Sequence, residues 1–426
     1  MSAARPDSRW DLLLAGGDLL DPATGPAVRG DVAVAGGVVA AVGPHLPRDR
    51  ADQVLDVTGR LVTPGLVDMH THVYADATYW GTDPDPIAWS SGVTTWVDAG
   101  SAGAYGFAAF ARQAQAYTVG VPAFLNISAV GLTASVGESR ELGNLDVDLA
   151  VATAAAHPGT IRGFKVRIDK HNVGAHGVEP LRRAVAAGTA AGLPVMVHIG
   201  AAPPSLADVL PLLRPGDIVT HCASGIAAGA AGFDPAAKEA YQAGVVFDLG
   251  HGSGGFAFDV LDAQLAAGMP PHAVSTDLHA RSLHGPVFDL PVTMAKMLAA
   301  GMDLADVVAA ATVRPARILG LPEGVGTLTV GAPADIAVFA VLREPFVVAD
   351  VHGQVRTAPL RLLNEATYRA GRLLPPRLPA PPAPWIPLTD AQRAALSERD
   401  RAVRRLLTTP LVGPDGLAEH FPRHGG

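Results

Sequence analysis

Eight short apolar runs recur along residues 61–279, and their spacing limits the folds that this chain can adopt. In chain order they are LVTPGLVDMH, GVTTWVDAG, VPAFLNIS, IRGFKVRI, PVMVHIG, DIVTHCA, VVFDLGHG and AVSTDLH. They lack the polar–apolar alternation of a strand with one face in water, which indicates strands buried on both faces. Helix-like segments lie between them, such as EPLRRAVAAGTAAG and AAKEAYQAG. This alternation predicts an α/β fold, a (β/α)8 TIM barrel.

The two ends of the chain have a different pattern, of short β-branched runs separated by glycine turns. DLLLAGGDLL and DVAVAGGVVAAVG each predict two short strands joined by a Gly-Gly turn. We expect residues 1–58 and 322–376 to form one small β domain, and residues 59–321 to form the barrel. Residues 377–426 begin with a proline-rich connector, and a helix from Thr389 to about Leu407 follows. We expect this tail to have no catalytic role.

Composition excludes several classes of protein. The 426 residues are 49% hydrophobic and 17% charged, a balance that buries a large core and argues against global disorder. The net charge of -8 gives no electrostatic reason to bind nucleic acid or an anionic membrane. One cysteine, Cys222, cannot form an intramolecular disulfide and fits a reducing compartment. With no secretory signal and no run apolar enough to span a bilayer, we expect a soluble, cytoplasmic protein.

Side chains that bind metals stand at the polar ends of the runs. Residues two apart in an extended segment share a face, so His70 and His72 can point at one ion. Four more runs end in an ionisable residue, where a purely structural core would place none. These residues are Lys165, His198, His221 and Asp277. The pattern predicts a metal site where the strands end.

Lys165 has two possible roles. Only four of the 32 basic residues are lysines, so a lysine in a buried strand is not a product of composition. It could pair with a carboxylate such as Asp68 or Asp277. Alternatively, its amine could react with carbon dioxide to form a carbamate, which can bridge two cations and requires the neutral amine that burial favours. We favour the carbamate, because four imidazoles and two carboxylate-type donors suit zinc or a similar cation.

These motifs resemble the amidohydrolase superfamily. VTPGLVDMHTH, GFKVR, PVMVHIG, DIVTHCASG and STDLH carry the resemblance, which extends from Asp11 to about Leu374. It implies a barrel with a binuclear metal centre and a small β-sandwich domain formed from both chain ends. GVTTWVDAGSAGA, GDIVTHC, FDLGHGSGGF and STDLHAR are most similar to the dihydroorotase-like amidohydrolase/deacetylase metallohydrolases. That group resembles enzymes that cleave acetyl esters or amides of small carboxylates.

The resemblance also implies a role for each strand-end residue. His70, His72 and Asp277 would hold the first divalent metal, His198 and His221 the second, and N6-carboxylated Lys165 would bridge them. A hydroxide shared by two metals, expected to be zinc, would attack the acyl carbon, and Asp277 would move its proton to the leaving group. We therefore expect a hydrolase of acyl, above all acetyl, amides or esters of small-molecule carboxylates, assembled as a homo-oligomer.

Three other functions stay open at this point. A cyclic amidohydrolase would open a dihydroorotate, hydantoin or imide ring with the same metal ligands and a different pocket. A non-catalytic scaffold is disfavoured because all six ligand positions are intact. A nucleobase deaminase is disfavoured by the lysine bridge and the binuclear set.

Substrate contacts are expected in the loops after the strands. Arg167 lies two residues beyond Lys165, so it could share the inward face and bind a substrate carboxylate. His251 lies in a glycine-rich stretch after the seventh run, and His279 and Arg281 follow the eighth. His284, Asn126 and Ser128 are further candidates. A structural or solvated role is an equal alternative for these loop residues.

Overall fold

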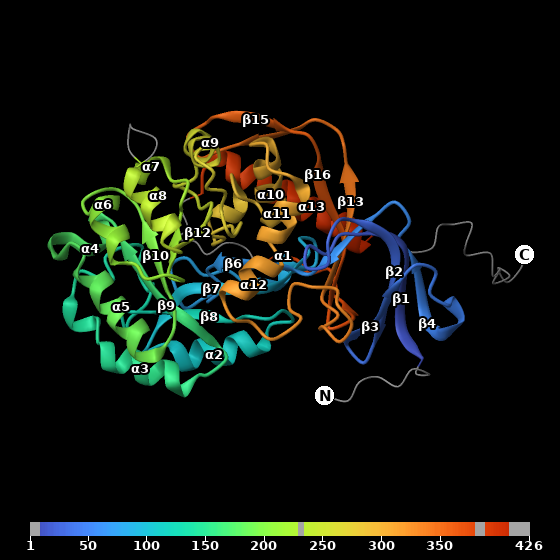
Figure 1. Cartoon of the computed structure of the whole chain (residues 1–426), viewed down its shortest axis with the longest axis horizontal. Helices are drawn as coiled ribbons and strands as arrows, with labels where there is room; N and C mark the ends of the chain where they lie inside the picture. The colour runs from blue at the N-terminus through green and yellow to red at the C-terminus, as the bar shows by residue number, and fades with distance from the viewer. Residues whose placement is uncertain (1–8, 229–233, 380–387, 409–426) are drawn as a thin grey trace, which may run out of the picture.

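The computed structural model describes residues 9–228, 234–379 and 388–408. Figure 1 shows two parts: a barrel surrounded by helices, and beside it a sheet that joins N-terminal strands to C-terminal ones. The predicted connector falls largely on residues 380–387, and the first eight residues of the predicted small domain likewise lie outside the described residues. No helix in the described ranges combines the length and the apolar character that a membrane span requires.

Seven parallel strands form most of the barrel, each beside the next in chain order. They are β6 (Leu66–Thr71), β7 (Val93–Gly103), β8 (Ala123–Asn126), β9 (Ile161–Ile168), β10 (Val195–Ile199), β11 (Ile218–Thr220) and β12 (Val246–Asp248). Nearly every residue in these strands is buried, in agreement with their continuous apolar sequence. Strands β6 to β12 correspond to the first seven runs of the sequence.

The eighth run closes the ring without forming a regular strand. Ala273 bridges Asp248 of β12, and Leu278 bridges Thr71 of β6, each in parallel sense. The backbone N–H of His72 donates to the carbonyl of Leu278 at 2.8 Å. Asp277 has a φ of 49°, in the left-handed region, so the extended backbone is interrupted there. The predicted (β/α)8 barrel is confirmed, although its last strand is irregular.

The helices cover the outside of the barrel and the loops at its strand ends (Figure 1). Apart from the helix of the C-terminal tail, those of six or more described residues are α2 (Phe107–Ala116), α3 (Val147–Ala156), α5 (Glu179–Ala191), α8 (Pro235–Gln242), α9 (Phe258–Ala266), α10 (Leu290–Ala299), α11 (Leu304–Ala310) and α12 (Val313–Ile318). Single-turn helices are α1 (Asp85–Ala88), α4 (Lys170–Val173), α6 (Leu206–Val209) and α7 (Gly225–Ala228). Helix α5 buries Leu181, Ala184 and Ala187 at helical spacing, and Gly192 follows its last residue with a φ of 67°, which suits glycine.

Both chain ends contribute to a single outer sheet, in the order β17-β16-β13-β5-β1-β2-β3, with β4 beside β1. Its strands are β1 (Trp10–Leu19), β2 (Val28–Ala35), β3 (Val38–Gly43), β4 (Ala51–Asp56), β5 (Leu61–Pro64), β13 (Ile336–Leu342), β16 (Arg361–Arg369) and β17 (Arg372–Leu373). Strand β5 holds the first four residues of the first apolar run. That run therefore contains two strands, of which β5 lies in the outer sheet and only β6 in the barrel.

The two Gly-Gly pairs have different structures. Gly36 and Gly37 join β2 to β3, and their φ values of 58° and 81° fit the predicted turn. Gly16 and Gly17 instead lie inside β1, where the pairing with β2 shifts register between Leu14 and Gly17. The prediction of two short strands there was wrong, since a β-bulge takes up the extra residues within one continuous strand.

The predicted tail helix is α13 (Asp390–Thr408). Its start is capped by Thr389, whose hydroxyl accepts a hydrogen bond from the backbone N–H of Gln392 at 3.2 Å. The Gln392 side chain donates to the carbonyl of Gly285 at 3.2 Å, which ties this helix to the loop after the eighth run. A hairpin of β14 (Phe346–Ala349) and β15 (Val355–Ala358) packs against α10 nearby.

Candidate metal centre

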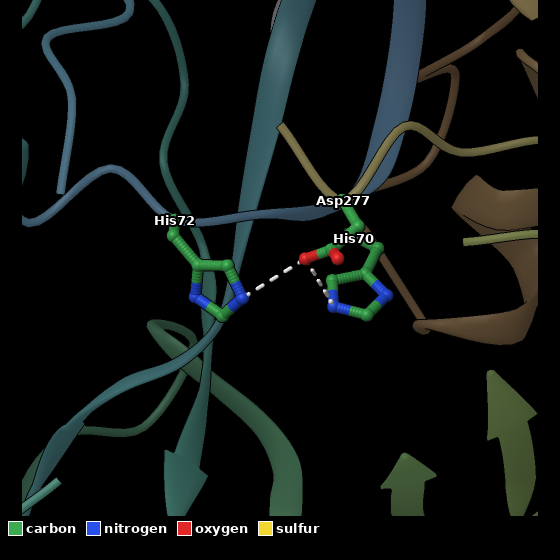
Figure 2. Close-up of side chains that lie close together, drawn as sticks. All are labelled: His70, His72 and Asp277. Atoms are coloured by element: carbon green, nitrogen blue, oxygen red, sulfur yellow. Dashed lines mark ion pairs between the residues drawn. The ribbon is translucent and has the colours of Figure 1, made fainter. Parts of the chain in front are cut away.

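Two histidines and an aspartate converge where β6 ends (Figure 2). Oδ1 of Asp277 lies 3.2 Å from Nε2 of His70 and 3.1 Å from Nε2 of His72. One ligand atom of each residue lies within 4.8 Å of the others, a spacing that allows all three to hold one metal ion. Although burial raises the pKa of Asp277, the two imidazoles lower it well below its usual range, so the carboxylate is ionised.

His198 and His221 lie beside this triad, at the ends of β10 and β11. Their ring centroids are 4.4 Å apart, and that of His221 is 5.1 Å from that of His70. Nδ1 of His221 pairs with the carbonyl of Gly250, whereas its buried Nε2 has no hydrogen-bond partner among the described residues. Burial lowers the pKa of His221 well below its usual value, which leaves a neutral ring. A buried, unpaired imidazole nitrogen fits a divalent cation.

Lys165 completes the group from β9 and is 1% exposed. Its Nζ lies 3.1 Å from Nε2 of His70 and 3.3 Å from Sδ of Met196. Burial lowers its pKa to about 7. No carboxylate within the described ranges pairs with it inside 4 Å, and Asp68 instead accepts a hydrogen bond from the Thr276 hydroxyl at 2.6 Å. Among the described residues, Lys165 thus has no ion pair with either Asp68 or Asp277.

A second set of side chains orients the first two imidazoles. Nδ1 of His70 lies 2.7 Å from the Thr220 hydroxyl, which donates to Asp248 at 2.7 Å. Nδ1 of His72 lies 2.9 Å from the hydroxyl of Ser101. Each ring thus has its Nδ1 occupied and its Nε2 turned toward Asp277, as in histidines that bind metals through Nε2. The sequence did not single out these partners, which follow no recognisable spacing.

Two of the six non-glycine residues that have a left-handed backbone in the described part of the chain belong to this site. Besides Asp277, His221 has a left-handed backbone, with a φ of 63°. Residues other than glycine avoid this region, and where they adopt it the surrounding structure must compensate. Both residues turn at the ends of their runs, and this geometry directs their side chains into the common site.

Gly100 makes room for Lys165, which leads to a prediction about stability. Its φ is 82°, and a methyl group there would overlap Cβ and Cγ of Lys165, the latter at 2.7 Å. We expect Gly100→Ala to lower the free energy of unfolding by about 3 kcal/mol, because backbone strain and overpacking add. Gly216→Ala is the matched control, since Gly216 has a φ of 87° and no atom within 4 Å of its added Cβ. We expect about 1 kcal/mol there, and equal urea midpoints would contradict the argument.

Comparison with known proteins agrees with this geometry. The model of the amidohydrolase family matches residues 218–363. A deacetylase of Agrobacterium fabrum is 35% identical over 346 residues, 79% of this chain and 84% of the relative. A deacetylase of Enterococcus faecalis is 32% identical over 373 residues, 85% and 99% of the two chains. The chain belongs to the amidohydrolase family. The resemblance found in the sequence is thereby confirmed.

Solved structures support the same assignment for this amidohydrolase. An adenine deaminase structure superposes with a TM-score of 0.80 at 31% identity, over 85% of this chain and 99% of that one. A dihydroorotase structure superposes with a TM-score of 0.78 at 32% identity, over 85% and 98%. Amidohydrolases depend on metals, and the triad of His70, His72 and Asp277 provides a site for one.

The amidohydrolase has a cavity of about 440 Å³ directly above the six strand-end residues, all of which line it. Arg167 and His279 also line it, in agreement with their predicted place. His251, Arg281 and His284 do not appear in its described lining. Asn126 does not line it either, since its side chain donates to the carbonyl of Gly100 at 2.9 Å. Ser128 likewise bonds elsewhere, to the carbonyl of Glu138 at 2.8 Å.

Arg167 is held in place by an acid that the sequence did not reveal. Its Nε and one Nη donate to the two carboxylate oxygens of Glu138 at 2.6 and 2.7 Å. Glu138 comes from the long loop after β8, so no local pattern connects the two residues. The pair neutralises a buried cation and fixes the orientation of the guanidinium, and the remaining Nη can face a ligand.

The rim of the cavity holds two more residues that the sequence missed. Trp80 lies against His279 with ring centroids 4.8 Å apart, and burial lowers the pKa of His279 to about 4. Asp169 lies 3.5 Å from Nε2 of His198 and accepts hydrogen bonds from the first residues of α4. Asp169 is four residues beyond Lys165 at the end of the same strand, a signal that could have identified it.

Proposed function

We propose that this amidohydrolase is a metal-dependent deacylase, which removes an acyl group, above all acetyl, from an amide or ester of a small carboxylate. The observation that carries the proposal is the group of six donors beneath the cavity, with the buried Nε2 of His221 unpaired. The relatives named deacetylases support the reaction class, because their similarity extends over 79–85% of this chain.

The six donors divide naturally between two cations. His70, His72 and Asp277 would hold one and His198 and His221 the other, with carboxylated Lys165 between them. Bound divalent cations, zinc being the first candidate, supply Lewis acidity and lower the pKa of a coordinated water toward neutrality. Lys165 can accept carbon dioxide because its amine is buried, with a pKa lowered to about 7.

The side chains have three further roles in the proposed reaction. Asp277 takes up the proton of the attacking water and delivers it to the leaving nitrogen or oxygen. Arg167, fixed by Glu138, binds the carboxylate of the substrate. Trp80 and His279 form a wall that excludes water from the reacting carbonyl. We expect the substrate to be a small molecule, since the cavity holds about 440 Å³.

The deciding experiment is a hydrolysis panel with the zinc-loaded protein in bicarbonate. Turnover of both enantiomers of N-acetyl and O-acetyl carboxylates is compared with turnover of dihydroorotate, hydantoins and cyclic imides. We expect turnover of the linear acyl compounds alone. Turnover confined to the rings would instead establish the cyclic amidohydrolase alternative, which the similarity to the dihydroorotase structure keeps in view.

Arg167 offers a separate test of substrate recognition. We expect Arg167→Met to raise KM for a carboxylate substrate about 30-fold, because a charge-assisted hydrogen bond is worth about 2 kcal/mol. For the methyl ester of the same substrate, KM should rise much less. The difference between acid and ester therefore separates loss of the carboxylate contact from general damage to the site. Arg182→Met on the exposed face of α5 is the control. Equal losses with acid and ester would rule out the carboxylate contact.

A further inference from the structure

A second cavity, of about 550 Å³, lies beside α10. It is bordered by α10, the loop before it, strand β14 and Ser90. Its described lining consists of Ser90, Pro286, Phe288, Asp289, Val292, Lys296, Phe346, Val347, Val348 and Ala349. None of these residues lines the cavity above the metal ligands. The volume is in the range of small-molecule sites, and most of the lining is apolar.

One buried amine faces this apolar cavity. Lys296 is 1% exposed, and its Nζ donates to Nε2 of His251 at 2.7 Å and to the carbonyl of Pro286 at 2.8 Å. An ammonium group has three N–H donors, so two bonds leave one available. No carboxylate in the described part of the chain pairs with it within 4 Å. Asp289 serves as the N-cap of α10, where it accepts from the N–H of Val292 at 2.9 Å.

His251 does not balance the charge of Lys296. Its Nδ1 lies 2.8 Å from the carbonyl of Gly252, which fixes the proton on that nitrogen and leaves Nε2 as an acceptor. Burial and the neighbouring amine lower the pKa of His251 well below its usual value, so the ring is neutral. Burial lowers the pKa of Lys296 to about 7, against an opposing effect of the Asp350 carboxylate, so the ammonium form is populated at and below neutral pH. That form has two neutral acceptors, and no carboxylate lies within 4 Å of it among the described residues. A buried charge in this state is stabilised by an anionic ligand.

We propose that this cavity is a second binding site, for a small monocarboxylate with an apolar body. The carboxylate pairs with Nζ of Lys296, and the apolar body packs against Phe288, Val292 and Phe346. A phosphate fits less well, because a doubly charged anion needs several donors and this lining offers one cation. His251 lies one residue from Gly252, which lines the metal-site cavity, so the test must distinguish the two sites.

The probe is 3-methylbutyrate, measured by equilibrium dialysis with the metal-loaded, full-length protein. We expect saturable binding in the millimolar range to wild type, and binding at least tenfold weaker for the uncharged isostere 3-methylbutanamide. Lys296→Met should weaken binding of the carboxylate at least tenfold. Lys238→Met, which changes an exposed lysine on α8, should bind as wild type. Arg167→Met should also retain this binding, since Arg167 belongs to the other cavity.

A second variant keeps the test independent of how Lys296→Met folds. Val347 lines the cavity and is 64% exposed, so the larger side chain of Val347→Trp is expected to occupy part of the cavity without disturbing the core. We expect this variant to lose the binding although Lys296 is intact. Equal affinity for the carboxylate and the amide, binding by Val347→Trp equal to wild type, or loss of binding in Arg167→Met alone would each overturn the proposal.

Discussion

Replacing Asp277 with asparagine is expected to lower kcat by about 10²–10⁴-fold while the protein keeps its cations. The amide can still offer an oxygen near His70 and His72, but it cannot take up or release the proton. Asp277 is the side chain that both imidazoles contact, at 3.2 and 3.1 Å. The measurements are steady-state turnover of the best acyl substrate and metal content by elemental analysis.

The control is Asp303→Asn, which changes an exposed aspartate whose side chain makes no cap hydrogen bond at the start of α11. We expect that variant to match wild type in both measurements. Undiminished turnover by Asp277→Asn, with the metal retained, would rule out the role of Asp277 in proton transfer. Loss of metal together with turnover would reassign Asp277 to metal binding alone.

Removing Lys165 is expected to lower turnover by a similar factor and, in addition, to weaken metal binding. Lys165→Met keeps the length of the side chain but cannot form a carbamate, so cation affinity should fall by more than about 100-fold and turnover with it. Lys238→Met is the control, because Lys238 is exposed on α8. With ¹³C-bicarbonate, wild type should show a carbamate carbon resonance by NMR that the variant lacks.

Lys165 also leads to a prediction of how the rate of metal reactivation depends on pH. Only the neutral amine reacts with carbon dioxide, and burial lowers the pKa of Lys165 to about 7. Reactivation of metal-free protein by bicarbonate and zinc should therefore be fast above pH 7 and slow progressively as the pH falls below it. A rate that stays constant from pH 6 to pH 8, or full metal binding by Lys165→Met, would exclude the carbamate.

The barrel could be predicted from the sequence because its signal is local. Each run is apolar along its length and polar at its end, so the sequence alone predicts that His70, His198 and His221 lie at strand ends. The structure brings these residues together because the carboxyl ends of parallel strands meet at one edge of the barrel. The same reasoning located Arg167 on the inward face of β9.

What could not be predicted depends on contacts between distant segments or on backbone angles. Glu138 reaches Arg167 from a separate loop, and Lys296 on α10 reaches His251 in the loop after β12. The left-handed backbone of Asp277, which breaks the eighth strand, has no sequence signature, because aspartate adopts this conformation more often than most residues but still only in a small minority of positions. A Gly-Gly pair is equally ambiguous, because a turn and a bulge both use its conformational freedom.

The position of β5 in the outer sheet has a consequence for the synthesis of the protein on the ribosome. One edge of β5 pairs with β1, whereas its other edge pairs with β13, which is made about 270 residues later. At about 5–20 residues per second, that edge waits roughly 15–55 s for its partner. Throughout this interval Leu61 and Val62 lie on a strand with one unpaired edge, the kind of edge to which chaperones or other nascent chains attach. A chain that stops before residue 336 never covers it.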